Sequence, residues 1–327
     1  MKTLLTNVLI PVLVCGALIS GCSVPIFSSP TPTTPAAAFT WTASPSPAPA
    51  ASSTATLTFT TSPIELPPSI VSPTPAEDLL PTVVSPVAPL TITILYNNIP
   101  FDARLKTDWG FSALVEYRGG ILLFDTGRDG QILLHNMQVL SIDPARIQYV
   151  VLSHIHSDHT GGLDALLEVA AQPSVYLLPS FGDAYNQGVQ RVTEGIEVTP
   201  GQPITEYMLT TGEISGAIPE QALIVRTPAG LIIVAGCAHP GIVRVIERAV
   251  ELTGEPVYLV LGGFHLGDKS EAELAAIIRD FRQLGVQKVA PSHCTGEQAI
   301  NMFAAEYGMD FLRTGVGSVI NVEISSR

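Results

Sequence analysis

The chain has 327 residues, a formal net charge of −13 and no cluster of lysine and arginine residues. Proteins that follow a nucleic-acid backbone need clustered basic side chains, so this charge pattern argues against nucleic-acid binding. The length allows one large domain or two small ones, and composition divides the chain into three parts.

The first part has the features of a secretory signal. Lys2 precedes the apolar run 8–14, which is shorter than the ~20 residues that a membrane-spanning helix needs. Residues 19–22, Ile-Ser-Gly-Cys, resemble the processing site of bacterial lipoproteins. We therefore expect removal of residues 1–21 and lipidation of Cys22. An ordinary signal peptide with a chance cysteine is the less favoured alternative.

Residues 22–89 are rich in proline, serine, threonine and alanine. The stretch 23–89 holds fifteen of the 27 prolines and no lysine or arginine. Its few apolar side chains cannot offset the entropy lost on folding, and proline keeps a chain extended. We expect a disordered linker that holds residues 90–327 outside the cytoplasm, anchored to a bacterial membrane through Cys22.

Residues 90–327 are expected to form a single domain. Short apolar runs with β-branched residues predict strands, and helical spacing of apolar residues occurs between several of them. This alternation predicts an α/β domain with helices outside two packed sheets. The predicted strands are residues 90–96, 111–117, 121–124, 147–152, 175–178, 222–226, 231–234, 257–261 and 286–290.

Three helices have start signals in the sequence. One follows Ser270, which forms a capping box with Glu273. A second begins with Pro240 in the first helical position, where the missing N–H is tolerated. A third follows Thr295 as its cap, with Gln298 as the capping partner.

The segment 179–220 has weak periodicity and is predicted to be a long loop. Loops of this length inside compact domains often act as lids or binding loops. The segment contains Thr211, Gly212 and Glu213, and Arg191 is its only cation. We expect substrate recognition to depend on this segment.

Histidines follow several of the predicted strands. His154, His239, His265 and His293 each come a few residues after a strand ends. Functional side chains in layered α/β folds gather at such positions. The two cysteines of the domain, Cys237 and Cys294, each lie beside one of these histidines, which indicates site residues rather than a disulfide framework. 

Residues 153–162 bring three imidazoles and a carboxylate together within six positions. His154 and His156 lie on one side of an extended chain, so they can bind one metal together. Asp158 and His159 come at the turn into a helix and can face a second metal. Zn²⁺, Fe and Mn accept such ligands, and a metal pair can activate a hydroxide. Surface histidines with a helix cap at Asp158 or Thr160 are the weaker alternative.

This motif resembles the His-x-His-x-Asp-His signature of the metallo-β-lactamase superfamily. The resemblance covers the domain from about Leu90 and implies the αββα sandwich of that superfamily. Residues 123–127 are similar to its first motif, whose aspartate, here Asp125, supports the metal ligands. Residues 236–241 and 291–296 are similar to its later metal-ligand motifs.

Five further motifs resemble one subfamily, named for a 7,8-dihydropterin-6-methyl-4-(β-D-ribofuranosyl)-aminobenzene-5'-phosphate synthase. The chain departs from that subfamily at Asn97, where an aspartate is usual, and at Trp109, where many members have histidine. Both changes bear on substrate contacts. The matching motifs are residues 110–112, 211–214, 236–242, 262–266 and 291–296.

The resemblance implies two ligand sets, His154, His156 and His239 for one metal and Asp158, His159 and His293 for the other. The superfamily usually adds a bridging carboxylate, and this chain has no aspartate at the corresponding place. Cys237 is nearest to it and is interpreted equally as a thiolate ligand or as a small buried residue. His265 is interpreted as an additional ligand, as a proton donor and anion contact, or as a histidine satisfied by backbone groups.

The function predicted from these features is that of a metal-dependent hydrolase with two divalent ions, preferably zinc, with manganese or iron as alternatives. A metal-bridged hydroxide, held in line by Asp158, would attack a small ester, phosphoester or lactone-like substrate. His265 is the second expected catalytic residue. The alternatives are a synthase or transferase acting on a pterin-like phosphorylated substrate, against which an extracytoplasmic location argues, and a non-catalytic metal-containing binding lipoprotein.

Overall fold

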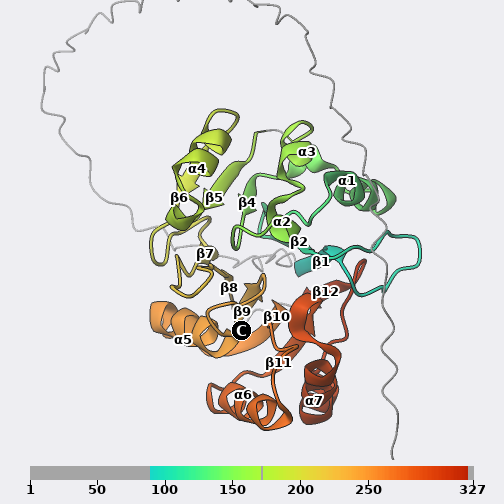
Figure 1. The fold of residues 1–327 in the computed structure, drawn as a ribbon, viewed down its shortest axis with the longest axis vertical. Coiled ribbons are helices and arrows are strands. Elements are labelled where there is room, and N and C mark those ends of the chain that lie inside the picture. The colour runs from blue at the N-terminus through green and yellow to red at the C-terminus, as the bar shows by residue number, and fades with distance from the viewer. Residues whose placement is uncertain (1–88, 171, 323–327) are drawn as a thin grey trace, which may run out of the picture. The chain divides into compact units, whose positions relative to one another are not determined.

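The computed structural model describes residues 89–170 and 172–322 (Figure 1). The predicted signal, the lipidation site Cys22 and the linker up to residue 88 lie outside these residues. Within the described part of the chain, no helix is both long and apolar enough to cross a membrane.

Two β-sheets form the centre of the domain. The larger has the strand order β12-β1-β2-β3-β4-β5-β6, and the smaller has the order β11-β10-β9-β8-β7. The strands are β1 (Leu90–Asn97), β2 (Phe111–Tyr117), β3 (Gly120–Phe124), β4 (Tyr149–Val151), β5 (Ser174–Leu177), β6 (Gly195–Glu197), β7 (Met208–Thr210), β8 (Leu223–Thr227), β9 (Gly230–Ala235), β10 (Val257–Gly263), β11 (Lys288–Ser292) and β12 (Val319–Val322).

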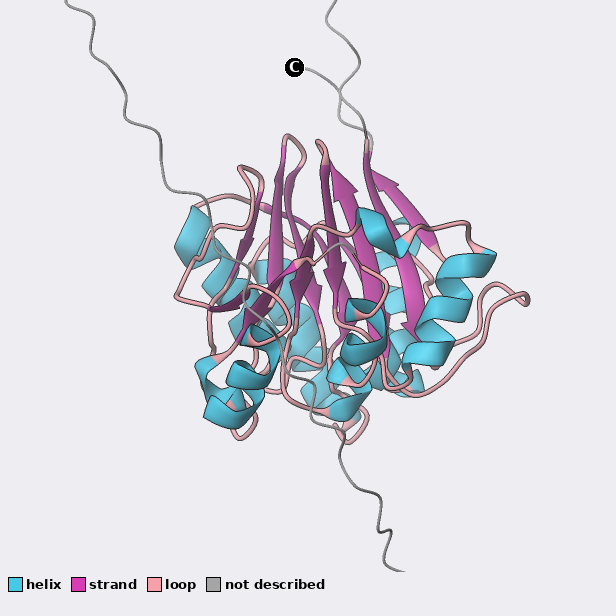
Figure 2. Ribbon diagram, turned by 90° about the horizontal axis from the view of Figure 1, so that it is seen from above, coloured by secondary structure: helices cyan, strands magenta, loops and turns pink. Residues whose placement is uncertain are grey.

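Helices cover the outer faces of both sheets. Figure 1 shows α1, α3 and α4 on the outside of the larger sheet and α5, α6 and α7 on the outside of the smaller one, and Figure 2 shows helices packed alongside the strands. The helices are α1 (Gly130–Val139), α2 (Ser157–Thr160), α3 (Leu163–Leu167), α4 (Asp183–Gln190), α5 (Ile242–Thr253), α6 (Glu271–Gln283) and α7 (Glu297–Tyr307). The αββα architecture implied by the sequence is confirmed.

The smaller sheet separates two hydrophobic cores because side chains alternate along its strands. On β9, Ile232 and Val234 join the core that includes residues of the larger sheet. Leu231 and Ile233 face the other way, into the core formed with α5, α6 and α7. This continuous apolar run is typical of a central strand buried on both faces.

Parallel pairing places the ends of several strands at a common edge. β3, β4, β5 and β6 are parallel to one another, as are β9, β10 and β11. The loops that follow β4, β9, β10 and β11 carry the histidines singled out in the sequence. The fold therefore delivers these side chains at the carboxyl ends of its strands.

Two of the three predicted helix starts were wrong. α5 begins at Ile242, after Gly241 with a φ of 105°, so Pro240 lies in the preceding turn. α7 begins at Glu297 after Gly296, and the Thr295 hydroxyl instead donates to the carbonyl of Ser292 (2.6 Å). The capping box at the start of α6 is confirmed.

The strand predictions need three additions and a shift. β6, β7 and β12 were not predicted. The strand predicted at residues 286–290 is β11, which begins two residues later. The segment 179–220 is not one long loop, since it contains α4, β6 and β7.

Candidate metal centre

The His-x-His-x-Asp-His motif connects β4 to α2. His154 is fully buried, and His156 is the N-cap residue of α2. The side chain of Ile155, between them, is 37% exposed. The extended backbone at His156 and the helical turn at Asp158 thus place the candidate ligands at two neighbouring positions.

Site A consists of His154, His156 and His239. Their candidate ligand atoms all lie within 4.8 Å of one another. Nε2 of His154 lies 3.1 Å from Nδ1 of His156. Among the described residues, none offers a hydrogen-bond partner to the buried Nε2 of His239.

Site B consists of Asp158, His159 and His293, whose candidate ligand atoms also lie within 4.8 Å of one another. Oδ2 of Asp158 is 3.5 Å from Nε2 of His159 and 3.4 Å from Nε2 of His293. In the described part of the chain, Nε2 of His293 has no hydrogen-bond partner. The structure therefore assembles both ligand sets that the family resemblance implied.

These two triads fit divalent metal ions. Buried imidazole nitrogens without partners are costly, and a cation placed between them would satisfy their lone pairs. Imidazole and carboxylate donors suit zinc, iron and manganese.

Two side chains orient the histidines of site B. Oδ2 of Asp125 accepts from Nδ1 of His159 at 2.6 Å, and Oδ1 of Asn98 lies 2.9 Å from Nδ1 of His293. A hydrogen bond at Nδ1 leaves the Nε2 lone pair free for a metal and fixes the ring. The supporting position expected for Asp125 agrees with this geometry.

Asp125 also ties the end of β3 to the loop after β4. Its Oδ1 accepts from the Ser153 amide at 2.7 Å, and its Oδ2 accepts from the Ser153 hydroxyl at 2.8 Å. The same hydroxyl lies 2.9 Å from Nδ1 of His154. A Cβ on Gly236 would come within 2.1 Å of that hydroxyl oxygen. Only glycine therefore allows the backbone after β9 to lie this close to Ser153.

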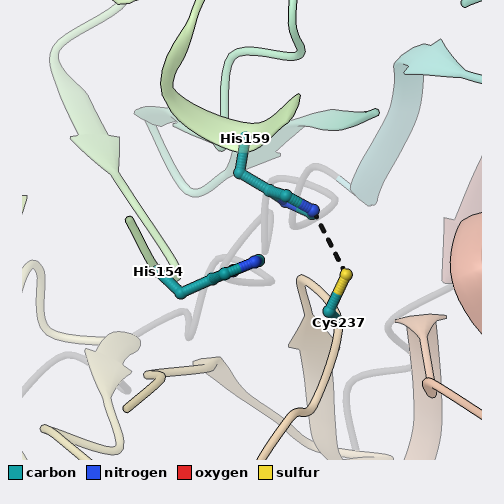
Figure 3. Close-up of side chains that lie close together, drawn as sticks. All are labelled: His154, His159 and Cys237. Carbon is teal, nitrogen blue, oxygen red and sulfur yellow. Dashed lines mark hydrogen bonds between the residues drawn. The ribbon is translucent and has the colours of Figure 1, made fainter. Parts of the chain in front are cut away.

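Cys237 is the common neighbour of the two sites. Its Sγ belongs to a cluster with His154 and His159, which come from different sites, and lies 3.3 Å from Nε2 of His159 (Figure 3). Further clusters join it to His239 with His265 and to His293 with Cys294. The thiol is buried at a strand end, as expected of a small buried residue. It also lies next to ligands of both metal sites, as expected of a thiolate ligand.

His265 lies at the outer edge of site A. Its ring centroid is 4.3 Å from that of His239, and the residue is exposed. A hydrogen bond with the Cys294 thiol raises the pKa of His265. This position is compatible with an additional ligand or with a proton donor to a bound substrate.

Strained backbone is concentrated at this centre. Asp125, Ala238, His265 and His293 have φ values between 51° and 57°. Residues other than glycine rarely adopt this left-handed backbone conformation, and such strain is typical of functional sites.

The two sites differ in the protonation of their histidines in the metal-free protein. Burial and the neighbouring His159 lower the pKa of His154 strongly, and burial lowers the pKa of His239 to about 4. For His159, burial favours the neutral ring, but the Asp125 carboxylate outweighs it and raises the pKa to about 10. His154 and His239 in site A are therefore neutral at pH 7, whereas His159 in site B carries a proton on each nitrogen.

Glu220 is a site residue that the sequence analysis missed. Its carboxylate is buried and accepts hydrogen bonds from three consecutive amides, those of Cys237 (2.8 Å), Ala238 (2.8 Å) and His239 (2.9 Å). Burial raises its pKa to about 7, although the amides act in the opposite direction. A glutamate before a predicted strand carries no sequence signal for this role.

Other residues named from the sequence lie at different distances from the centre. The Trp109 ring packs against His293 with a centroid separation of 4.9 Å, and the side chain is 45% exposed. Glu213 accepts from the amide of Ser180 at 3.1 Å. Arg191 is the exposed C-cap residue of α4 and belongs to none of the metal-ligand clusters of the described residues.

Comparisons with known proteins agree with this geometry. The model of the metallo-beta-lactamase superfamily matches residues 110–195. The chain is 31% identical over 270 residues to 7,8-dihydropterin-6-methyl-4-(beta-D-ribofuranosyl)-aminobenzene-5'-phosphate synthase of Methanocaldococcus jannaschii, covering 67% of this chain and 92% of that protein. A solved metal-dependent hydrolase of the beta-lactamase superfamily is 29% identical with a TM-score of 0.62, covering 72% of this chain and 99% of that one. The metallo-beta-lactamase fold protein YhfI from Bacillus subtilis is 14% identical and has a TM-score of 0.52. The match covers 72% of this chain and 100% of that chain.

Proposed function

The chain belongs to the metallo-beta-lactamase superfamily, and we propose that within it this protein is a metal-dependent hydrolase of a small ester, phosphoester or lactone-like substrate. Sites A and B would hold two divalent ions, with zinc favoured because histidine and cysteine dominate the donors. Such ions, when bound, lower the pKa of water and polarise a scissile carbonyl or phosphoryl group. The convergence of two triads around one thiol is the observation that carries the proposal.

Asp158 would hold the attacking water. Burial raises the pKa of its carboxyl group, but the neighbouring rings of His159 and His293 outweigh burial and lower it well below the usual range. The carboxylate is therefore ionised at neutral pH and can accept a hydrogen bond from water. Fixing the water in line with the scissile bond lowers the entropic part of the barrier.

His265 would donate a proton to the leaving group. It stands at the exposed edge of site A, beside His239. Its raised pKa increases the protonated fraction near neutral pH, which is the form that a general acid needs. We propose that Cys237, the common neighbour of both sites, occupies the place of the bridging carboxylate.

The test uses the full chain, loaded with zinc and freed of unbound metal. Hydrolysis of phosphoester, lactone and β-lactam panels is measured with and without a chelator, next to a His156→Ala variant. We expect chelator-sensitive turnover of one substrate class that His156→Ala abolishes. Two bound ions without any turnover would instead support a non-catalytic metal-containing binding protein.

A synthase or transferase acting on a pterin-like phosphorylated substrate is the second candidate. It is favoured by the 31% identity to the Methanocaldococcus jannaschii synthase over 92% of that protein. The two candidates differ in the acceptor of the transferred group, which is water for a hydrolase. Incubation with a dihydropterin diphosphate and an aminobenzene acceptor, followed by mass spectrometry, distinguishes a joined product from a hydrolysed one.

We further propose that the protein is anchored to a bacterial membrane outside the cytoplasm through lipidated Cys22. The proposal rests on the sequence of residues 19–22 and on the proline-rich composition of residues 22–89. Labelling of growing cells with a fatty-acid analogue should mark the wild-type chain and leave Cys22→Ala unlabelled. Equal labelling of both would contradict the proposal.

A further inference from the structure

Glu220 and Gln221, two adjacent residues before β8, bind the two loops that carry the ligands of site A. The carboxylate of Glu220 accepts from the amides of Cys237, Ala238 and His239. These three residues lie in the loop after β9, from which the His239 ring reaches site A. One buried carboxylate thus holds three consecutive amides of that loop.

Gln221 binds the other loop. Its amide donates to the carbonyl of Ser153 at 2.9 Å, immediately before His154. Its Nε2 donates to the carbonyl of Leu152 at 2.9 Å and to that of Tyr176 on β5 at 3.3 Å. Its Oε1 accepts from the hydroxyl of Thr210, so both ends of the side chain are satisfied.

The two residues are themselves held in place. Glu220 and Ile214 exchange two backbone hydrogen bonds, of 2.9 and 3.2 Å. Glu220 is 1% exposed and Gln221 is fully buried. A buried polar network whose members are all paired is rigid, so the two loops have a fixed separation.

The ligands of site A depend more on such backbone hydrogen bonds than those of site B. The rings of His159 and His293 are oriented directly, by Asp125 and Asn98. In the described structure, Nε2 of His239 has no hydrogen-bond partner, and Ala238 before it has a φ of 56°. Three amides converging on a carboxylate can hold a left-handed turn of this kind.

We propose that Glu220 and Gln221 form a positioning clamp that sets the geometry of site A by fixing the His239 loop against the His154 loop. The proposal rests on the metal centre of the proposed function but not on the reaction catalysed there. Both residues act through the ligands that they hold, so they are positioning residues rather than catalytic ones.

The clamp is tested by titrating the purified full chain and its variants with zinc and measuring the heat of binding by calorimetry. Glu220→Ala should weaken zinc binding at site A by about 10–100-fold, the usual effect of losing an outer hydrogen-bond partner, and affect site B less, through Cys237 alone. The titration should then resemble that of His239→Ala. Glu220→Gln retains one acceptor oxygen and should restore part of the affinity.

Glu213→Gln is the matched control, because Glu213 lies in the same segment but binds the amide of Ser180 instead. Cobalt replaces zinc in a parallel series, since its visible spectrum reports the ligand geometry at each site. We expect Glu220→Gln to change the spectrum of site A more than that of site B and Glu213→Gln to change neither. Thermal unfolding of the metal-free variants identifies any that fail to fold, and the glutamine variant then carries the test.

Wild-type affinity and an unchanged cobalt spectrum at site A in folded Glu220→Gln and Glu220→Ala would overturn the clamp. Equal weakening of both sites would also overturn it, because a general loss of structure explains that result. If the wild type binds two ions but hydrolyses nothing, the proposed function fails while the clamp stands.

Discussion

Sites A and B lie side by side, yet the protein holds their ligands in different ways. In site B, side chains contact the rings directly, through Asp125 on His159 and Asn98 on His293. In site A, His239 is placed through its backbone, which Glu220 holds. One metal centre thus combines rings that are oriented by side chains with a ligand that is oriented through its loop backbone.

The sites also differ in charge. Site B contains the carboxylate of Asp158, whereas site A has three imidazoles. A divalent cation gains more from an ionised oxygen donor with oriented neighbours than from neutral nitrogens alone. We therefore expect site B to bind its ion more tightly and site A to fill second.

The largest effect is expected from Asp158→Ala, which removes the carboxylate of site B. Loss of a ligand should weaken zinc binding there by more than the ~10–100-fold that an outer partner contributes. Zinc titration of the variant should show one strong site fewer, with site A retained. Retention of both sites would mean that the carboxylate is not a ligand and that the sites do not differ in this way.

Asp125→Asn should weaken site B by about 10–100-fold, because the ring of His159 loses its charged acceptor. Site A should be affected less, through the Ser153 hydroxyl that lies between Asp125 and His154. Competition with a chelator of known zinc affinity measures both effects. Equal losses at the two sites would remove the contrast in how the rings are oriented.

The pH dependence should separate the sites. His159 has a pKa raised to about 10, so zinc must displace a proton from it at any lower pH, and rising pH should strengthen site B. Between pH 6 and 9 the affinity should increase about tenfold per pH unit. His239, with its pKa lowered to about 4, is already neutral there, so this ligand adds no pH dependence to site A and its affinity should rise less steeply than that of site B.

Proton release measured by calorimetry in buffers of different ionisation enthalpy checks this expectation. More protons should leave as site B fills than as site A fills, because His159 is protonated and His239 is not. A greater release at site A instead would reverse the assignment.

The smallest effect is expected from Asn98→Ala, which removes a neutral acceptor from the ring of His293. We expect about tenfold weaker zinc binding at site B, near the lower end of the range for an outer partner. Asn301→Ala, at an exposed position of α7, is the matched control. Wild-type affinity in Asn98→Ala would show that the backbone alone holds His293.

The sequence predicts the ligands because their chemistry is local. His154, His156, Asp158 and His159 fall within six positions, and strand and turn geometry alone divides them between two sites. His239 and His293 needed the family resemblance, since their distance from this motif along the chain says nothing about their distance in space.

The residues that hold the ligands were harder to predict. Glu220 binds backbone amides 17 to 19 residues later in the chain, and backbone groups have no sequence signature. The helix starts at Pro240 and Thr295 were wrong for a related reason. Glycines at 241 and 296 adopt conformations set by the tertiary path of the loops, which override the local capping signals.

Two separately held metal sites are tested by a zinc titration of the full wild-type chain beside His239→Ala, with bound metal counted by elemental analysis. We expect two ions per wild-type chain and one per His239→Ala chain, the remaining ion bound with the affinity of site B. A single ion in the wild type, or loss of both ions in a folded His239→Ala protein, would contradict the existence of two separately held sites.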